Sequence, residues 1–258
     1  MNRILTIGYG AVSYLIFLLA FLYAIGFVGN LVVPRSIDAG ITAPFAEALI
    51  VNVVLLGLFA VQHSVMARPA FKRRWTRFVP SAIERSTYVL VSSLLLLLLY
   101  WQWRTMPSVV WDVTPPAGRV ILWVLFGLGW ATVLASTFMI NHFDLFGLRQ
   151  VYLAWRGQPY TDLPFRTTML YRVVRHPIMV GFIIAFWATP TMTVGHLLFA
   201  GATTAYIIIA LQLEERDLIA ALGDDYRGYR RRVAMLIPGL HHRGERGAPT
   251  RPAAQGTT

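Results

Sequence analysis

The chain has 258 residues, of which 56% are hydrophobic and only 14% are charged. An ordinary soluble domain holds roughly 45–50% apolar and about 25% charged residues, so this composition excludes a disordered or fibrous protein and disfavours a soluble enzyme. The chain contains no cysteine, which excludes disulfides, cysteine-ligated metal centres and a thiolate nucleophile. The first apolar segment is too long for the hydrophobic region of a cleavable signal peptide, so we expect the protein to keep it.

Five segments without Asp, Glu, Lys or Arg are long enough to cross a membrane, which takes about 20 apolar residues. In chain order they are residues 4–34, 48–67, 86–103, 120–143 and 176–213. The last is too long for one crossing and carries Pro190 and Gly195 near its middle, which predicts a helical hairpin. The sequence therefore predicts an all-α integral membrane protein with five to six transmembrane helices, the last two forming a hairpin.

The net charge of +11 is informative about topology. With the hairpin in place, Arg35, Arg104 and Arg119 fall on one side of the membrane and the other 20 Lys and Arg residues on the opposite side. Cytoplasmic loops carry the excess of basic residues, so we expect both termini in the cytoplasm. Basic charge here also suits contact with anionic membrane lipids, and we expect no nucleic-acid partner.

The connections between the spans differ in length. Residues 35–42 and 105–118 are rich in Pro and Gly and predict simple turns. Residues 141–175 form a longer connection that predicts a folded loop or lid. Beyond residue 213 we expect the helix to continue to Gly223, followed by an amphipathic helix with Tyr226 and Tyr229 on one face. The last segment, 243–258, predicts a disordered tail, which leaves residues 1–242 as one domain.

Polar side chains within membrane spans are costly and are therefore site candidates. They collect at the predicted cytoplasmic ends of four spans: Gln62 and His63; Asn141, His142 and Asp144; Arg175 and His176; Glu214 and Glu215. We expect these ends to converge on one cytoplasmic pocket. Helix ends also favour polar residues as caps and anchors, so a packing role for His63 is as plausible as a functional role. Three polar residues within 141–144 exceed what one cap needs and favour a functional role.

The remaining histidines and motifs give less information about function. His196 falls at the opposite turn and predicts a structural role, and His241 and His242 predict solvated side chains. No helix shows the HxxxH or HxxE spacing of a metal site, so we expect no metal. The pair Gly127 and Gly129 lacks the third glycine and the preceding strand of a dinucleotide-binding site.

The C-terminal third resembles a known superfamily. Its motifs are Arg175-His176-Pro177 with Gly181, then Glu214-Glu215, Leu222-Gly223, Tyr226, Tyr229, Val233 and Pro238. This order resembles the C-terminal module of isoprenylcysteine carboxyl methyltransferases, with Met179 and Leu222 replacing a Tyr and a Phe. The resemblance implies a cytoplasmic module, about residues 170–240, that binds S-adenosylmethionine. Membrane sterol reductases that use NADPH share this module shape.

The same resemblance implies roles for single residues of that module. Arg175, His176, Pro177 and Gly181 would shape the cofactor pocket. Glu214 or Glu215 would bind a ribose hydroxyl or the amino group, and Tyr226 and Tyr229 would wall the pocket with aromatic faces suited to a sulfonium or an adenine. For Tyr229, packing against lipid headgroups is an equal alternative.

Motifs nearer the N-terminus are similar to a narrower family. Residues 62–68, 71–75, 84–88 and 141–150 resemble the bacterial methanethiol S-methyltransferases, which are related to NnrU-type membrane proteins. The resemblance implies an enzyme of the bacterial cytoplasmic membrane that methylates a small thiol, converting methanethiol to dimethyl sulfide, and that also methylates hydrogen sulfide.

Methyl transfer requires aligned reactants and an ionised thiol. We therefore expect His142, oriented by Asp144 and accompanied by Asn141, to accept the proton, with His63 as the next candidate and Arg149 stabilising the thiolate. Three other functions stay open. They are a methyltransferase for carboxylate or lipid substrates, an NADPH-dependent membrane reductase, and a transporter or sensor, the last disfavoured because no charge lies in mid-membrane.

Overall fold

The computed structural model describes residues 2–161, 163 and 167–240, so the predicted tail at 243–258 lies outside the described residues. Within this part, five helices are long and apolar enough to span a membrane. They are α1 (Arg3–Gly29), α2 (Phe45–Ala67), α4 (Ser81–Gln102), α5 (Pro116–Ile140) and α9 (Val194–Leu222). The prediction of an all-α membrane protein is confirmed.

The last apolar segment forms the predicted hairpin, but its two arms are unequal. The first arm, α8 (Pro177–Trp187), has 11 residues, or roughly 16 Å at about 1.5 Å per residue. The short strand β4 (Thr191–Thr193) follows, and α9 returns over 29 residues. Because α8 covers only half of a ~30 Å hydrocarbon core, it reaches part of the way across and is covered by its neighbours.

Proline marks where several helices begin. Pro44 and Pro80 occupy the N-cap positions of α2 and α4, and Pro116 and Pro177 open α5 and α8. A proline at a helix start loses no hydrogen bond, because the first backbone N–H groups of a helix have no intrahelical acceptor. For α2, α4 and α5, these positions explain why the helix starts a few residues before the charge-free segment.

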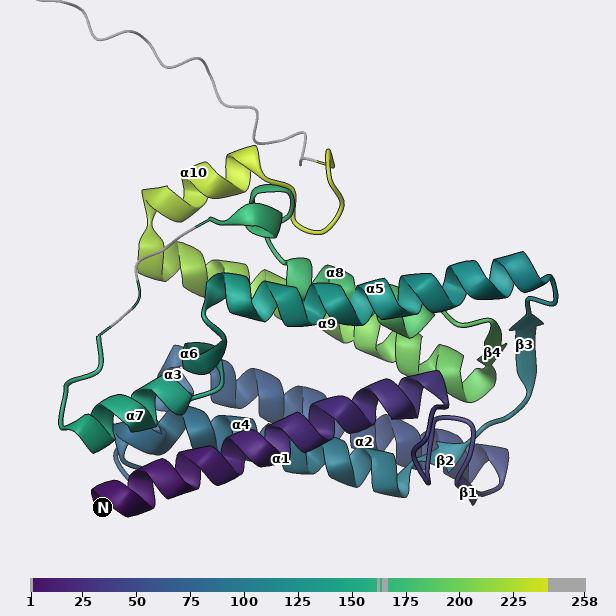
Figure 1. Ribbon diagram of the computed structural model, residues 1–258, viewed down its shortest axis with the longest axis horizontal. Coiled ribbons are helices and arrows are strands. Elements are labelled where there is room, and N and C mark those ends of the chain that lie inside the picture. Colours follow the sequence, from purple (N-terminus) through teal and green to yellow (C-terminus); the bar gives the residue numbers. More distant parts are fainter. Residues whose placement is uncertain (1, 162, 164–166, 241–258) are drawn as a thin grey trace, which may run out of the picture.

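The helices form two groups that pack on each other (Figure 1). In one group α5 packs along α8, and α8 contacts α9; in the other, α1 and α2 both pack against α4, and α2 also contacts α9. The main core between them is aromatic, with Phe27, Tyr100, Trp103, Trp130 and Phe199 among its buried members. A second, smaller core surrounds Met66, Tyr88 and Val89.

Helices α5 and α8 approach each other backbone to backbone at two glycines. A Cβ added to Gly129 would lie 2.8 Å from the carbonyl oxygen of Gly181, and one added to Gly181 would lie 2.7 Å from that of Gly129. Small residues allow close helix packing in membranes, where side-chain burial alone gives little driving force. The structure thus gives Gly181, expected in the cofactor pocket, a packing contact with α5.

One end of the bundle, called here the strand end, carries four short strands. Strand β1 (Ile41–Thr42) pairs in parallel with β2 (Arg104–Thr105), and Ile41 lies opposite Arg104. Strand β3 (Val109–Asp112) pairs antiparallel with β4, with Trp111 opposite Met192. The prediction of simple turns in these two connections was wrong, because they form strands: β1 pairs with β2, and β3 pairs with β4 in the turn between α8 and α9.

The other end, called here the α10 end, carries the short helices. They are α3 (Pro69–Trp75), α6 (His142–Leu145), α7 (Leu148–Arg156), the 3₁₀ helix η1 (Met169–Arg172) and α10 (Asp224–Arg232). The predicted folded connection after residue 140 is confirmed, since α7 packs against α1 and α4. The N-terminus also lies at this end (Figure 1).

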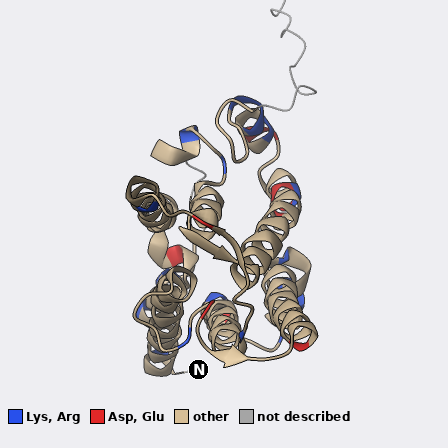
Figure 2. Ribbon diagram, turned by 90° about the vertical axis from the view of Figure 1, so that its right-hand side faces the viewer, with Lys and Arg blue, Asp and Glu red and all other residues tan. Residues whose placement is uncertain are grey.

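The basic residues are divided unequally between the strand end and the α10 end. Among the described residues, the basic side chains of the strand end are Arg35, Arg104 and Arg119, which lie beside Trp101, Glu47 and Asp112, respectively. Figure 2, seen from the strand end, shows mostly uncharged helices below a strongly basic α10. The alternation of basic residues expected for a membrane protein is therefore present in the fold.

Candidate functional site

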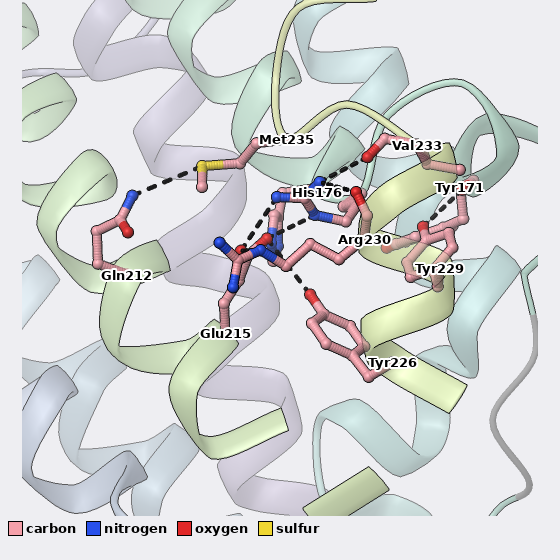
Figure 3. A network of polar contacts seen from close by, with 10 residues as sticks. Tyr171, His176, Gln212, Glu215, Tyr226, Tyr229, Arg230, Val233 and Met235 are labelled. Atoms are coloured by element: carbon pink, nitrogen blue, oxygen red, sulfur yellow. Dashed lines mark hydrogen bonds and ion pairs between the residues drawn. The ribbon is translucent and has the colours of Figure 1, made fainter. Parts of the chain in front are cut away.

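Glu215 of α9 is the centre of a buried polar cluster (Figure 3). Its side chain is 3% exposed and accepts two hydrogen bonds from Arg175, at 2.6 and 3.0 Å. Its Oε1 also accepts from Nε2 of His176 at 3.1 Å, and Arg230 lies 3.5 Å away. The Tyr226 hydroxyl donates to the same oxygen at 3.4 Å. We call these five residues the Glu215 group.

The chain around this group is held by backbone contacts as well. Val174 and Ala234 form a parallel bridge, and the amide of Arg175 donates to the carbonyl oxygen of Ala234 at 2.8 Å. Arg175 Nη1 also donates to the carbonyl oxygens of Val233 and Arg230. These acceptors compensate the buried guanidinium for its lost hydration. The Glu215 group therefore holds the start of α8 against α9 and α10.

The tyrosines of α10 are buried and face this group. Tyr226 is 2% and Tyr229 4% exposed, and the Tyr229 hydroxyl donates to the carbonyl oxygen of Tyr171. Burial raises the pKa of Tyr229 to about 12, so its phenol stays protonated. Packing of Tyr229 against lipid headgroups, the alternative considered from the sequence, does not agree with this position inside the fold.

Glu214 has different surroundings from its neighbour. It is exposed, and its carboxylate interacts electrostatically with the hydroxyls of Tyr88, Tyr171, Tyr206 and Tyr226. These tyrosines come from α4, η1, α9 and α10, so Glu214 lies where several elements of the α10 end converge. Four of the predicted cofactor residues, Arg175, His176, Glu215 and Tyr226, are thus in contact, with Glu214 beside them.

His63 belongs to a second cluster, between α2, α4 and α9. The Tyr88 hydroxyl lies 2.9 Å from Nε2 and 3.1 Å from Nδ1 of the ring, and the Ser92 hydroxyl lies 3.2 Å from Nδ1. Next to it, Ser64 bonds to Tyr206 at 3.2 Å, and Arg68 pairs with Asp217 at 2.9 Å. These last two contacts join the end of α2 to α9, close to Glu214.

His142 begins α6 and is 5% exposed. Its Nε2 lies 2.8 Å from the Tyr14 hydroxyl of α1, and its Nδ1 lies 2.9 Å from the Thr137 hydroxyl of α5. The ring of Phe138 stacks on it at 4.3 Å. Burial lowers the pKa of His142 below its ordinary value of 6.5, so the imidazole is neutral at pH 7 and able to accept a proton.

Asp144 does not orient His142 as expected from the sequence. Its Oδ1 accepts from Arg149 at 3.1 Å, and its Oδ2 accepts from the Tyr160 hydroxyl at 3.3 Å. Asn141 instead caps α6 by accepting the backbone N–H of Asp144 at 3.1 Å. The reason is geometric. Asn141 lies between the end of α5 and the start of α6, and within α6 the side chains of His142 and Asp144 point in different directions.

Asp144 faces a polar cavity of about 510 Å³ between α3, α4 and α7. Its lining includes Lys72, Glu84, Arg85 and Gln150, and the buried Oε1 of Gln150 has no hydrogen-bond partner within the described residues. Burial, and next the charge of Arg85, lowers the pKa of Lys72. Arg149 lies at its margin, over the Tyr160 ring and bonded to Thr161.

Sequence reasoning missed the tyrosine and hydroxyl partners of the two histidines, Tyr14, Tyr88, Ser92 and Thr137. All four lie inside apolar spans, where a hydroxyl residue is common and carries no distinctive spacing. The described residues contain no group of three or more His, Cys, Asp or Glu side chains arranged to hold a metal ion. His196 is buried at the strand end, where its Nε2 lies 2.9 Å from the carbonyl oxygen of Phe186.

The fold and these clusters define a helical membrane protein with a polar site at one end of the bundle. The family model described as NnrU protein matches residues 51–214. The chain is 72% identical to methanethiol S-methyltransferase of Mycobacterium tuberculosis, over 93% of this chain and 99% of that protein. It is 59% identical to methanethiol S-methyltransferase 2 of Bradyrhizobium diazoefficiens, over 93% of each.

More distant relatives include Nurim of Mus musculus, which is 34% identical over 65% of this chain and 66% of its own length. No solved structure matches the chain. The extent of the family match and the high identities show that this protein belongs to the NnrU family, within the branch of bacterial methanethiol S-methyltransferases.

Proposed function

We propose that this protein transfers a methyl group from S-adenosylmethionine to methanethiol, forming dimethyl sulfide. The observation that carries the proposal is 72% identity, over 93% of the chain, to a protein named methanethiol S-methyltransferase. Four further relatives with the same activity in their names are 49–59% identical over 89–93% of the chain. Methylation of hydrogen sulfide, a smaller thiol, is part of the same proposal.

The residues near Glu214 fit the proposed cofactor. S-adenosylmethionine supplies a sulfonium methyl group, and its positive charge and ribose hydroxyls suit an exposed carboxylate beside aromatic rings. Glu214 meets this requirement, whereas the oxygens of Glu215 are already bonded to Arg175, His176 and Tyr226. In this proposal Glu214 binds the cofactor, while Glu215 and Arg175 hold the shape of the module with Pro177 and Gly181.

The histidines fit the acceptor chemistry. A thiol must lose its proton to become a good nucleophile, and the pKa of cysteine, about 8.5, indicates that a small thiol is mostly protonated at pH 7. His142 is neutral and buried, which suits a proton acceptor in a site that excludes water. His63 is the second candidate, and Asp144 with Arg149 supports the connection that carries His142.

We place the site at the cytoplasmic face of a bacterial inner membrane, with both termini in the cytoplasm. Most of the basic residues lie at the α10 end together with the N-terminus, in agreement with the positive-inside rule. A volatile thiol can reach the site from the bilayer, and a charged nucleotide can reach it from the cytoplasm. The basic α10 end also suits contact with anionic lipid headgroups.

The names of the relatives favour methyl transfer over the NADPH-dependent alternative. In α10, Arg230 lies 3.5 Å from Glu215, and Arg227 forms an exposed pair with Asp224 at 2.9 Å. The test below therefore includes NADPH as a competing ligand.

The proposal is tested with purified protein in detergent, supplied with S-adenosylmethionine and methanethiol. We expect dimethyl sulfide in the headspace by gas chromatography and an equal amount of S-adenosylhomocysteine in solution. S-adenosylhomocysteine should raise the melting temperature of the protein and NADPH should not. A folded protein that is stabilised by NADPH, or that forms no dimethyl sulfide, would refute the proposed function.

A further inference from the structure

The hydrogen bonds around His142 determine which ring nitrogen carries the proton. The Thr137 hydroxyl has one hydrogen. Its oxygen lies 2.7 Å from the carbonyl oxygen of Leu134, which can only accept a hydrogen bond. Thr137 therefore accepts the contact at 2.9 Å from His142, so Nδ1 is the protonated nitrogen. In the neutral ring Nε2 is then the acceptor, and it takes its hydrogen bond from the Tyr14 hydroxyl at 2.8 Å.

His63 also contacts a tyrosine and a serine. The Ser92 hydroxyl donates to Oε1 of Gln62 at 3.2 Å and lies 3.2 Å from Nδ1 of His63. The Tyr88 hydroxyl lies 2.9 Å from Nε2 and 3.1 Å from Nδ1. The α10 end thus contains two Tyr–His pairs, and in the pair of Tyr14 and His142 each ring nitrogen has a single hydroxyl partner.

The ring of Phe146 lies beside the pair of Tyr14 and His142. Its centroid is 4.9 Å from that of His142 and 6.5 Å from that of Tyr14, and it stacks on Phe17 at 3.8 Å. Phe146 also packs against the small core that contains Tyr88. The surroundings of Tyr14 and His142 are thus aromatic and apolar, which suits a small uncharged thiol.

The accessible member of the first pair is the tyrosine. His142 is 5% exposed and has both ring nitrogens bonded, whereas Tyr14 is half-buried. Because the Tyr14 oxygen gives its own hydrogen to His142, its lone pairs remain available to accept one from another group. Tyr88, in the second pair, is itself buried at 9%.

We propose that Tyr14 is a catalytic residue that contacts the acceptor thiol, and that His142 receives the thiol proton through it. The S–H proton passes to the Tyr14 oxygen while the phenol proton passes to Nε2 of His142, leaving a thiolate and an imidazolium. The thiolate lone pair forms the new carbon–sulfur bond, and the electrons of the broken methyl–sulfur bond stay on the leaving sulfur. His142 then releases its proton to solvent. This inference rests on the proposed function.

The first test is Tyr14→Phe, which removes the hydroxyl and keeps the ring. We expect S-adenosylhomocysteine formation to fall about 10²–10⁴-fold at pH 7, the usual contribution of general acid–base catalysis, while thermal stabilisation by S-adenosylhomocysteine is retained. The loss should shrink as the pH rises, because methanethiol then ionises without help. A merely structural hydroxyl would show no such recovery.

Tyr9→Phe is the matched control. Tyr9 lies in the same helix, and its hydroxyl bonds to Thr87 of α4 at 3.0 Å, so the variant also loses one hydroxyl contact between α1 and a neighbouring helix. We expect its activity to stay within twofold of the parent. If Tyr14→Phe does not fold, Thr137→Val tests the same relay from the other side, because it removes the acceptor of Nδ1–H; full activity in that variant would overturn the inference.

A second readout needs no turnover. Nitrogen-15 NMR of histidine-labelled protein, assigned with His142→Gln, should show an unprotonated Nε2 and a protonated Nδ1 for His142 at pH 7. The opposite tautomer, or a Tyr14→Phe variant with activity within twofold of the parent, would overturn the inference. An inactive parent protein would instead refute the proposed function on which it rests.

Discussion

At the residue scale, two adjacent glutamates of α9 have opposite surroundings. Glu215 is buried against Arg175 and His176, and Glu214 is exposed toward the tyrosines. From the sequence the two were interchangeable candidates for the cofactor. Their different burial indicates a structural role for Glu215 and leaves Glu214 as the proposed ligand of the cofactor.

This difference is tested by parallel substitutions. Glu215→Gln leaves the guanidinium of Arg175 buried without its counter-charge, which typically costs about 3–5 kcal/mol, so we expect a clear drop in melting temperature. Glu214→Gln should leave the melting temperature within about 2 °C of the parent, since surface substitutions change stability by about 0.5 kcal/mol or less, but weaken S-adenosylhomocysteine binding measured by calorimetry. Equal effects of both variants on stability would contradict the assignment.

His142 gives the protein a pH-dependent contribution to stability. Burial lowers its pKa in the folded state below 6.5, so between pH 6.5 and that lower pKa the unfolded chain binds a proton that the folded protein does not. Folding is therefore disfavoured as the pH falls through this window. Between pH 7.5 and 5, we expect the melting temperature of the parent protein to fall further than that of His142→Gln. Identical falls would show that His142 does not titrate in this way.

At the element scale, the crossing of α5 and α8 depends on Gly129 and Gly181. A methyl group at Gly129 would lie 2.7 Å from the backbone nitrogen of Ala185, which has no room to move without shifting the helix. Overpacking of this kind costs about 1–3 kcal/mol, so Gly129→Ala should lower the melting temperature. Gly127→Ala is the control, because nothing lies within 4 Å of its added Cβ; similar losses in both would contradict the packing argument.

The elements also show what the sequence can and cannot predict. The five spans follow from charge-free segments, and the hairpin follows from Pro190 within an apolar segment that is too long for one crossing. The short strands were not predicted, because pairs such as Ile41 with Arg104 join segments far apart in the chain. Helix ends with polar residues pointed to His63 and His142, but Tyr14 lies in the middle of an apolar segment, where its contact with His142 depends entirely on how α1 packs.

At the scale of the whole molecule, the two ends of the bundle should face different compartments. The chain has no cysteine, so single cysteines report topology without background. We expect Ala117→Cys, exposed at the strand end, to react with a membrane-impermeant maleimide in intact cells. Thr76→Cys, exposed at the α10 end, should react only after the membrane is permeabilised. The reverse pattern would place the site outside the cytoplasm.

The contact between Arg175 and Val233 has a consequence for the order in which the protein is made. These residues are 58 positions apart, and a ribosome adds about 5–20 residues per second, so Arg175 waits roughly 3–12 seconds for the segment that encloses it. Glu215 of α9 is made 40 positions after Arg175 and can pair with it first. The carbonyl oxygens of Arg230 and Val233 follow last, so a chain interrupted before α10 would keep the buried ion pair but leave Nη1 of Arg175 without these two acceptors.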